Sequence, residues 1–187
     1  MMPIPALSHD LHYRALGLIK GTLQRISDHQ GLLLTEDGQE YPATPGRAQI
    51  LKKFSQCLDS PQPHWFYVQP QPRPGGVLGL GIIRILGLPE EEQDPAHFEA
   101  EFPLAPPDMA EGFHIRGDIQ IGKGTITVSV KRKPQGAKQF PPLQIPLEGF
   151  LPGSNDGEFW DLQAEREGQS LVLMDGSRVL PARSPAS

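Results

Sequence analysis

FHIRGDIQIGKGTITVSVK, residues 113–131, is the stretch that decides the fold of this chain. Apolar and polar side chains alternate in its second half, which places three apolar residues on one face: Ile126, Val128 and Val130. A period of two is typical of a strand that is buried on one side. Gly122-Lys123-Gly124 interrupts the alternation with residues that suit a tight turn. The stretch therefore predicts a β-hairpin with strands at 113–121 and 125–131.

The first half of the chain is also predicted to be rich in strands. Asp37-Gly38 favours a hairpin turn, and Gly17 and Gly21 mark places where a long first strand bends or bulges. Thr44-Pro45 predicts the start of a helix that extends to about residue 58, because a hydroxyl cap precedes a proline suited to the first turn. The predicted strands are 14–26, 31–35, 39–41, 65–68 and 77–86.

The second half continues with three more predicted strands, at 143–147, 158–164 and 170–179, the last of them folded back at Asp175-Gly176. Residues 149–157 are predicted to form a loop. The acidic, proline-bracketed run that begins at Pro89 predicts a connector over 89–111, because its charges and prolines do not suit a sheet interior. We expect a flexible N-terminus over 1–11 and a disordered tail over 183–187.

This element order resembles the oligonucleotide/oligosaccharide-binding (OB) fold, a small five-stranded barrel with a helix between its third and fourth strands. Residues 12–88 match that layout, and residues 112–182 match it without the helix. Ile19–Leu23 and Ile115–Ile119 also recur on the first strand of each half. The predicted fold is mainly β: two small OB-like, five-stranded barrels in tandem around separate apolar interiors, with one helix in the first. A six-stranded or SH3-like barrel would give nearly the same pattern.

Composition limits the classes of function. The 187 residues carry a net charge of −5, which argues against coating nucleic acid by clustered positive charge alone, so any nucleic-acid site must be local. Cys57 is the single cysteine and cannot form an intramolecular disulfide, which favours a reducing, cytoplasmic location. We expect no membrane association, because every apolar run is too short or interrupted to span a bilayer.

No catalytic, cofactor or metal motif is convincing. Gly117 to Gly124 has nearly the spacing of a phosphate-binding loop, but Gly124 stands where a hydroxyl is needed, and a strand follows instead of a helix. The six histidines are scattered, and Cys57 is expected to be a buried structural thiol on the helix. We therefore predict that the protein is not an enzyme and has no cofactor, metal ligands or catalytic residues.

Basic residues interleaved with aromatic ones are the remaining functional signal. Cations in the loop after residue 130 could hold a phosphate backbone, and aromatic rings could stack on bases. The predicted nucleic-acid-binding residues are Lys131, Arg132, Lys133, Lys138, Arg116, Phe113, Trp160, Lys20 and Arg25. The leading hypothesis is a non-enzymatic module that binds single-stranded RNA or DNA. The alternative is a protein-interaction or assembly factor that uses barrel edges and the proline-rich connector, and an enzyme of unknown type ranks third.

Overall fold

The computed structural model describes residues 13–86, 110–132 and 141–180. Ten strands in these ranges form one continuous hydrogen-bonded sheet. In the first half, the strands are β1 Arg14–Ser27, β2 Gln30–Leu34, β3 Glu40–Pro45, β4 His64–Arg73 and β5 Val77–Ile85. In the second half, they are β6 Gly112–Ile121, β7 Thr125–Val130, β8 Leu143–Glu148, β9 Phe159–Glu167 and β10 Ser170–Leu180. A 3-10 turn, η1 (Ala48–Ile50), and a helix, α1 (Leu51–Cys57), lie between β3 and β4.

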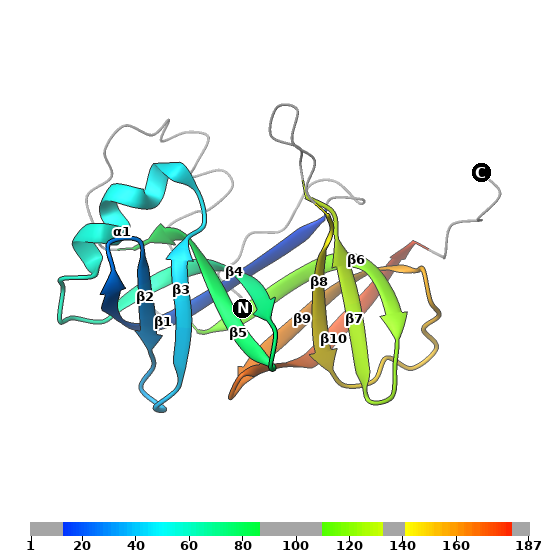
Figure 1. The fold of residues 1–187 in the computed structure, drawn as a ribbon. Helices are drawn as coiled ribbons and strands as arrows, with labels where there is room; N and C mark the ends of the chain where they lie inside the picture. The colour runs from blue at the N-terminus through cyan, green and yellow to red at the C-terminus, as the bar shows by residue number, and fades with distance from the viewer. Residues whose placement is uncertain (1–12, 87–109, 133–140, 181–187) are drawn as a thin grey trace.

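The first five strands close into a ring, which we call barrel 1 (Figure 1). β1 pairs with β2, β2 with β3, β3 with β5, β5 with β4, and β4 with β1. Within this ring, the 14 residues of β1 reach two neighbours, because residues 22–27 pair with β2 and residues 17–21 pair with β4. This ring order, with α1 between the third and fourth strands, is that of an OB-like barrel.

The last five strands repeat the same ring, which we call barrel 2. β6 pairs with β7, β7 with β8, β8 with β10, β10 with β9, and β9 with β6. Residues 149–158 connect its third and fourth strands as a loop, at the place where barrel 1 has its helix. The predicted fold class, mainly β with OB-like barrels and a helix in the first, is confirmed.

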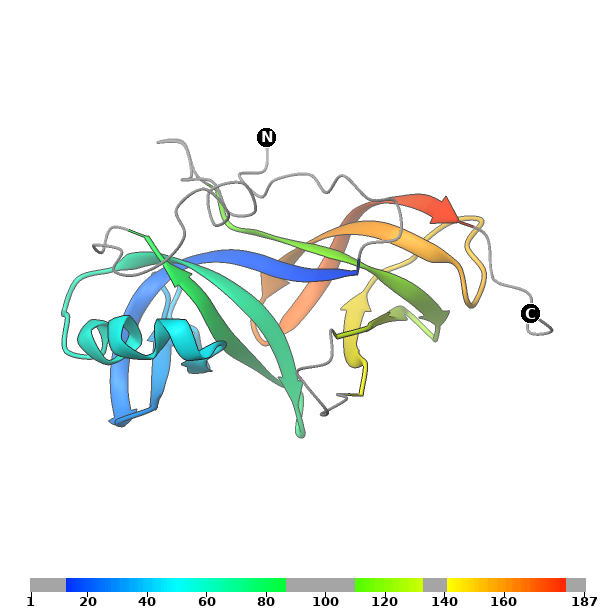
Figure 2. The ribbon, with the colours of Figure 1, turned by 90° about the horizontal axis from the view of Figure 1, so that it is seen from above.

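The two barrels lie side by side and are joined through their first strands (Figure 2). Residues 14–18 of β1 pair antiparallel with residues 112–116 of β6. Gly17 faces Phe113 in this pairing, and a Cβ atom on Gly17 would lie only 2.3 Å from the Phe113 ring. The absence of a side chain at Gly17 therefore gives the phenyl ring its place at the junction.

The register of the strands shows that the barrels are equivalent. Gly21 of β1 pairs with His64 of β4, and the residues 96 positions later, Gly117 and Trp160, pair in the same way between β6 and β9. The same shift of 96 positions relates Gly17 to Phe113, so these two residues occupy equivalent positions in the two barrels. They also pair with each other across the junction. The barrels are therefore related by an approximate two-fold axis that passes between these two residues.

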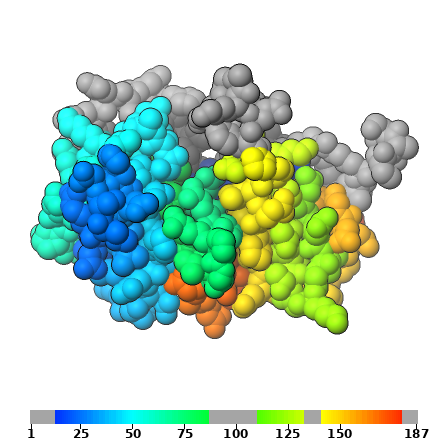
Figure 3. All heavy atoms as spheres, in the orientation of Figure 1, coloured from blue at the N-terminus to red at the C-terminus, as the bar shows by residue number. Residues whose placement is uncertain are grey.

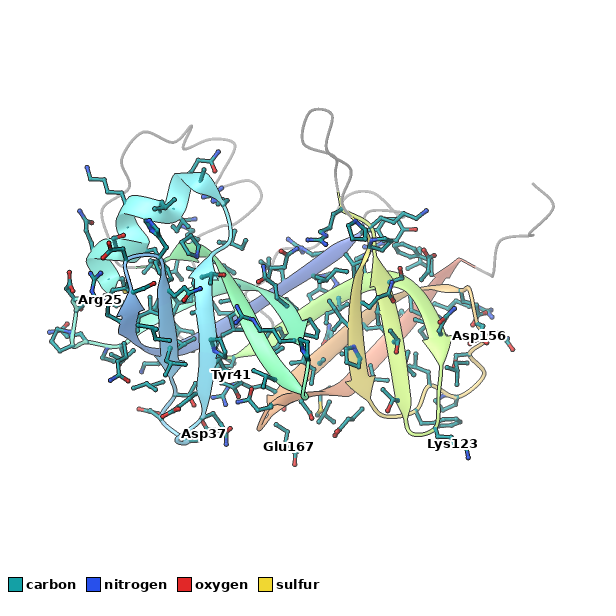
Figure 4. All side chains as sticks on the ribbon, in the orientation of Figure 1. Arg25, Asp37, Tyr41, Lys123, Asp156 and Glu167 are labelled. Atoms are coloured by element: carbon teal, nitrogen blue, oxygen red, sulfur yellow. The ribbon has the colours of Figure 1, made fainter. Side chains whose placement is uncertain are left out.

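Polar contacts tie barrel 2 to the open end of barrel 1. Arg166 of β9 contacts Asp37, at the tip of the β2–β3 hairpin, at 2.9 Å, and it contacts Glu111 at the same distance. The Tyr41 hydroxyl of β3 donates a hydrogen bond to the carbonyl oxygen of Gly168, in the turn between β9 and β10. Figure 4 shows Asp37 and Tyr41 on the side of barrel 1 that faces this turn.

Apolar packing is also continuous between the barrels. The buried side chains inside the two rings belong to one contact-connected cluster, which runs from Ile19 to Leu171, so the expectation of separate interiors is wrong. A smaller cluster of Leu16, Leu18 and Tyr67 packs on the other face of β1 and β4. The predicted boundaries of the two domains stay a prediction. Residues 1–11, 89–109 and 183–187, for which we predicted flexible ends and a connector, lie outside the described residues.

Two local predictions are corrected by the structure. Thr44 and Pro45 end strand β3 instead of starting the helix, because β3 continues its parallel pairing with β5 as far as Pro45 opposite Ile82. Asp175-Gly176 does not fold the last strand back. β10 runs on through both residues and pairs with β9 to its end, and only a register shift between Leu173 and Asp175 marks the place.

Candidate nucleic-acid interface

Three of the predicted binding residues are buried in the structure. Phe113 is 1 % exposed and Trp160 is 8 % exposed, and both belong to the main core cluster. A base can stack only on a ring face that solvent can reach, so these two rings would have to leave the core to act as predicted. Arg116 is 6 % exposed and lies on the outer face of β6.

Arg116 belongs to a buried polar network at the barrel junction. Its Nη1 atom lies 3.3 Å from a carboxylate oxygen of Asp161, and His114 Nε2 lies 2.7 Å from the other. Burial would raise the pKa of Asp161, but the hydrogen bond from His114 and the charges of His114, Arg116 and Arg14 outweigh it and lower that pKa. Asp161 therefore stays ionised, and the network holds β6 and β9 together.

Lys131 and Arg132 are exposed where β7 ends. The ammonium group of Lys131 lies 5.5 Å from the centre of the Tyr13 ring, and the Tyr13 hydroxyl donates a 2.6 Å hydrogen bond to Asp118. Arg132 donates a hydrogen bond from Nε to the carbonyl oxygen of Pro141 at 3.0 Å. Both cations can therefore be reached by a ligand at this end of barrel 2. Lys133 and Lys138 lie outside the described residues.

The two basic residues predicted in barrel 1 are not near this end. Lys20 is half-buried, its ammonium group lies 6.0 Å from the centre of the Trp65 ring, and its backbone N–H donates to Glu111. Arg25 forms ion pairs with Asp59 and Asp28. Figure 4 shows Arg25 at the end of barrel 1 that is far from barrel 2. The structure thus brings Lys131 and Arg132 together and leaves Lys20 and Arg25 elsewhere.

The outer face of β7 and β8 is the surface of barrel 2 that corresponds to the common ligand-binding face of OB-folds, formed by their second and third strands. We call it the β7–β8 face and define it by six outward-facing residues: Thr125, Thr127, Ser129, Gln144, Pro146 and Glu148. Gln144 donates a 3.2 Å hydrogen bond to the Ser129 hydroxyl across the strands. The face carries hydroxyl groups and a single carboxylate, and it ends at Lys131.

Phe150 is an exposed aromatic residue that is not among the predicted binding residues. Its side chain is 75 % exposed, the highest value among the large apolar residues described. It lies two residues after the end of β8, beyond the end of the β7–β8 face that is opposite Lys131. Its sequence context could have identified it, because an aromatic residue between Gly149 and a Pro-Gly turn at 152–153 is poorly placed to join a strand core.

Two observations on the described residues bear on metal binding and on thiol chemistry. In the three described ranges, no three His, Cys, Asp or Glu side chains gather as metal ligands would. Burial raises the pKa of the Cys57 thiol to about 11, so the thiolate needed for nucleophilic attack is scarce at neutral pH. None of the helices in these ranges is long and apolar enough to cross a membrane.

The fold and the site thus define an OB-like tandem barrel with an accessible strand face on its second barrel. Residues 115–180 match the family model of a cyanobacterial OB-fold-like RNA-binding domain, C-terminal. The match covers β7 to β10 and most of β6, that is, barrel 2 alone and less than half of the chain. No curated protein and no solved structure matches the chain.

Proposed function

We propose that this protein binds single-stranded RNA on the β7–β8 face of barrel 2, and that it acts by binding and not by catalysis. The observation that carries the proposal is that the segment similar to an RNA-binding domain, residues 115–180, coincides with barrel 2. Single strands are the form in which RNA is most often read, because their bases are free to be stacked and hydrogen-bonded.

The chemistry of the β7–β8 face supports this ligand. Lys131 and Arg132 offer cations for phosphates at one end, and Phe150 offers a ring for stacking at the other. Hydroxyl groups of Thr125, Thr127 and Ser129 between them suit ribose and phosphate oxygens. The seven residues from Thr125 to Lys131 extend for about 20 Å, which suits the lower end of the range of about 4 to 16 nucleotides bound by OB-folds.

The alternative of a protein partner has less support. Strand pairing closes both rings, barrel 2 through the single β8–β10 pair of Glu148 with Val172, and the family match points to RNA and not to a protein as the ligand. The proline-rich connector lies outside the described residues except for residues 110 and 111.

Replacement of Lys131 and Arg132 by Ala tests the proposal. Each cation that contacts a phosphate releases counterions, so the plot of log affinity against log salt should lose about 1.4 units of slope for the pair. Affinity for a labelled single-stranded RNA should fall by about tenfold at low salt. Fluorescence anisotropy at several salt concentrations measures both quantities, and a further variant that also replaces Lys133 and Lys138 should extend the loss.

The matched control removes two charges from barrel 1, with Arg25→Gln and Lys52→Gln together. These exposed residues lie on β1 and α1, so affinity and salt slope should stay close to those of the unchanged chain. An unchanged slope in the Lys131/Arg132 variant, an equal loss in the control, or no RNA binding by the chain would each contradict the proposal.

A further inference from the structure

A cleft of about 390 Å³ lies between the two barrels. The tip of the β4–β5 hairpin forms one wall, strands β7 and β8 form the other, and the β9–β10 turn lies below them (Figure 3). This volume falls in the range of small-ligand sites, about 300 to 1,000 Å³. Thr125, Pro146 and Glu148 line the cleft and also belong to the β7–β8 face, so a strand on that face reaches the opening of the cleft.

The cleft is formed before any ligand binds, because both barrels hold its base in place. The side-chain oxygen of Gln169 accepts a 3.0 Å hydrogen bond from the backbone N–H of Leu78. The nitrogen of the same amide donates a 3.0 Å hydrogen bond to the carbonyl oxygen of Glu40. Gln169, from the turn of barrel 2, is thus fixed to β5 and β3 of barrel 1. A site that needs little rearrangement loses little free energy to ordering on binding.

Two opposite charges line the cleft from different barrels. Arg73 ends β4 and Glu148 ends β8, and both side chains are exposed. Neither forms an ion pair or a hydrogen bond through its side chain with the part of the chain that the structure describes. Arg73 lies across β5 at Gly79, where a Cβ atom would come within 2.6 Å of its Nε atom. The missing side chain at Gly79 therefore lets the guanidinium group lie against the strand at the edge of the cleft.

We propose that this cleft holds one unstacked guanine base of a single-stranded RNA that lies on the β7–β8 face. The inference rests on the proposed function and adds the base that is selected. A guanidinium group pairs with the O6 and N7 acceptors of guanine in a bidentate way. A carboxylate accepts from the N1–H and N2–H donors on the neighbouring edge of the same base. Glu148 also repels phosphate, which favours the base over the backbone as the group that enters.

The other bases fit this pair of charges less well. Uracil has one N–H donor between two carbonyl acceptors, and adenine and cytosine place an amino donor next to their ring acceptors. None of them offers two adjacent donors on one edge and two adjacent acceptors on another. Discrimination by a bidentate contact is worth about 1 to 3 kcal/mol, which is a factor of five or more in affinity.

The test compares an oligouridine of about eight nucleotides with the same oligomer carrying one central guanosine. The full chain should bind the guanosine oligomer at least fivefold more tightly. Arg73→Gln should abolish this preference and weaken oligouridine binding only slightly. Glu148→Gln should reduce the preference while affinity for oligouridine stays the same or rises. Arg25→Gln, which removes one charge outside the cleft, should keep the full preference, and thermal unfolding of each variant shows that it is folded.

The outcomes separate the two proposals. Equal affinity for both oligomers, or a preference that survives Arg73→Gln, overturns the guanine site. If affinity still depends on Lys131 and Arg132 in that case, the proposed RNA-binding face stands without it. If neither oligomer binds, the proposed function itself fails and the guanine site fails with it. A preference for adenosine, cytidine or uridine at the central position also overturns the assignment of the base.

Discussion

Gly17 and Phe113 meet at the junction of the barrels. They face each other in the β1–β6 pairing, and the Phe113 ring is 1 % exposed. Interiors at protein-like density have no spare volume for an added methyl group, so such additions shift neighbouring backbone or force side chains out of their rotamers. The junction therefore depends on glycine at position 17 for space and not for backbone flexibility.

Gly17→Ala should lower the free energy of unfolding by about 1 to 3 kcal/mol, because the new Cβ atom would lie 2.3 Å from the Phe113 ring. Urea unfolding followed by tryptophan fluorescence measures the change. Phe113→Leu in the same chain should recover part of the loss, since the smaller side chain can move aside. Gly122→Ala is the control: it adds the same methyl group to an exposed turn and should cost much less. A Gly17 variant as stable as the original would show that the ring has other space.

The alternation of apolar and polar residues in the sequence places Phe113 and Trp160 on the inward faces of their strands. Phe113 is in phase with the buried Ile115 and Ile119, and Trp160 is in phase with Leu162. The prediction that they bind nucleic acid rests on the ability of their rings to stack on bases, whereas the strand pattern places both rings inward. Burial of Arg116 was not predictable in the same way, because its partner Asp161 lies 45 positions away, across the pairing of β6 with β9.

At the scale of elements, turn chemistry made the strand order predictable. The turns at Asp37-Gly38 and Gly122–Gly124 were predicted correctly, since each has a glycine with positive φ between alternating strands. Asp175-Gly176 has the same sequence as the turn at Asp37-Gly38. It forms an irregularity inside β10 instead of a turn, because pairing with β9 continues on both sides of it. The sequence could not distinguish a turn from a bulge where the partner strand is remote. The β1–β6 pairing was missed for the same reason.

The loop at 149–158 has a consequence for binding that a helix would not have. It leaves Phe150 exposed just after the end of β8, whereas Phe54 in the helix of barrel 1 is completely buried. Phe150→Ala should weaken RNA binding by about 1 to 3 kcal/mol through loss of stacking. It should leave the salt slope and the unfolding temperature nearly unchanged, because the ring carries no charge and packs little. Met174→Ala, at another exposed apolar side chain of barrel 2, is the matched control. Equal effects of the two variants would argue for a general apolar contact instead of stacking.

At the scale of the whole molecule, the barrels depend on each other. Barrel 2 contributes Arg166 and Gln169 to contacts with barrel 1, and the β1–β6 pairing covers an edge of each first strand. A fragment of residues 110–180 should therefore unfold at a lower temperature than the full chain, and its uncovered β6 edge should cause self-association. Calorimetry and size-exclusion chromatography test this. A monomeric fragment with the melting temperature of the full chain would show that barrel 2 needs no partner.

Gly17 and Phe113, the two different residues at the two-fold position, also determine which barrels can pair with each other. Two copies of barrel 2 joined through β6 in the same register would bring two phenyl rings to one point, and two copies of barrel 1 would leave a void there. When barrel 1 pairs with barrel 2, one phenyl ring occupies this position and fills the available space. The junction therefore accepts barrel 1 with barrel 2 and disfavours both like pairs, and this selectivity comes from one glycine opposite one phenylalanine.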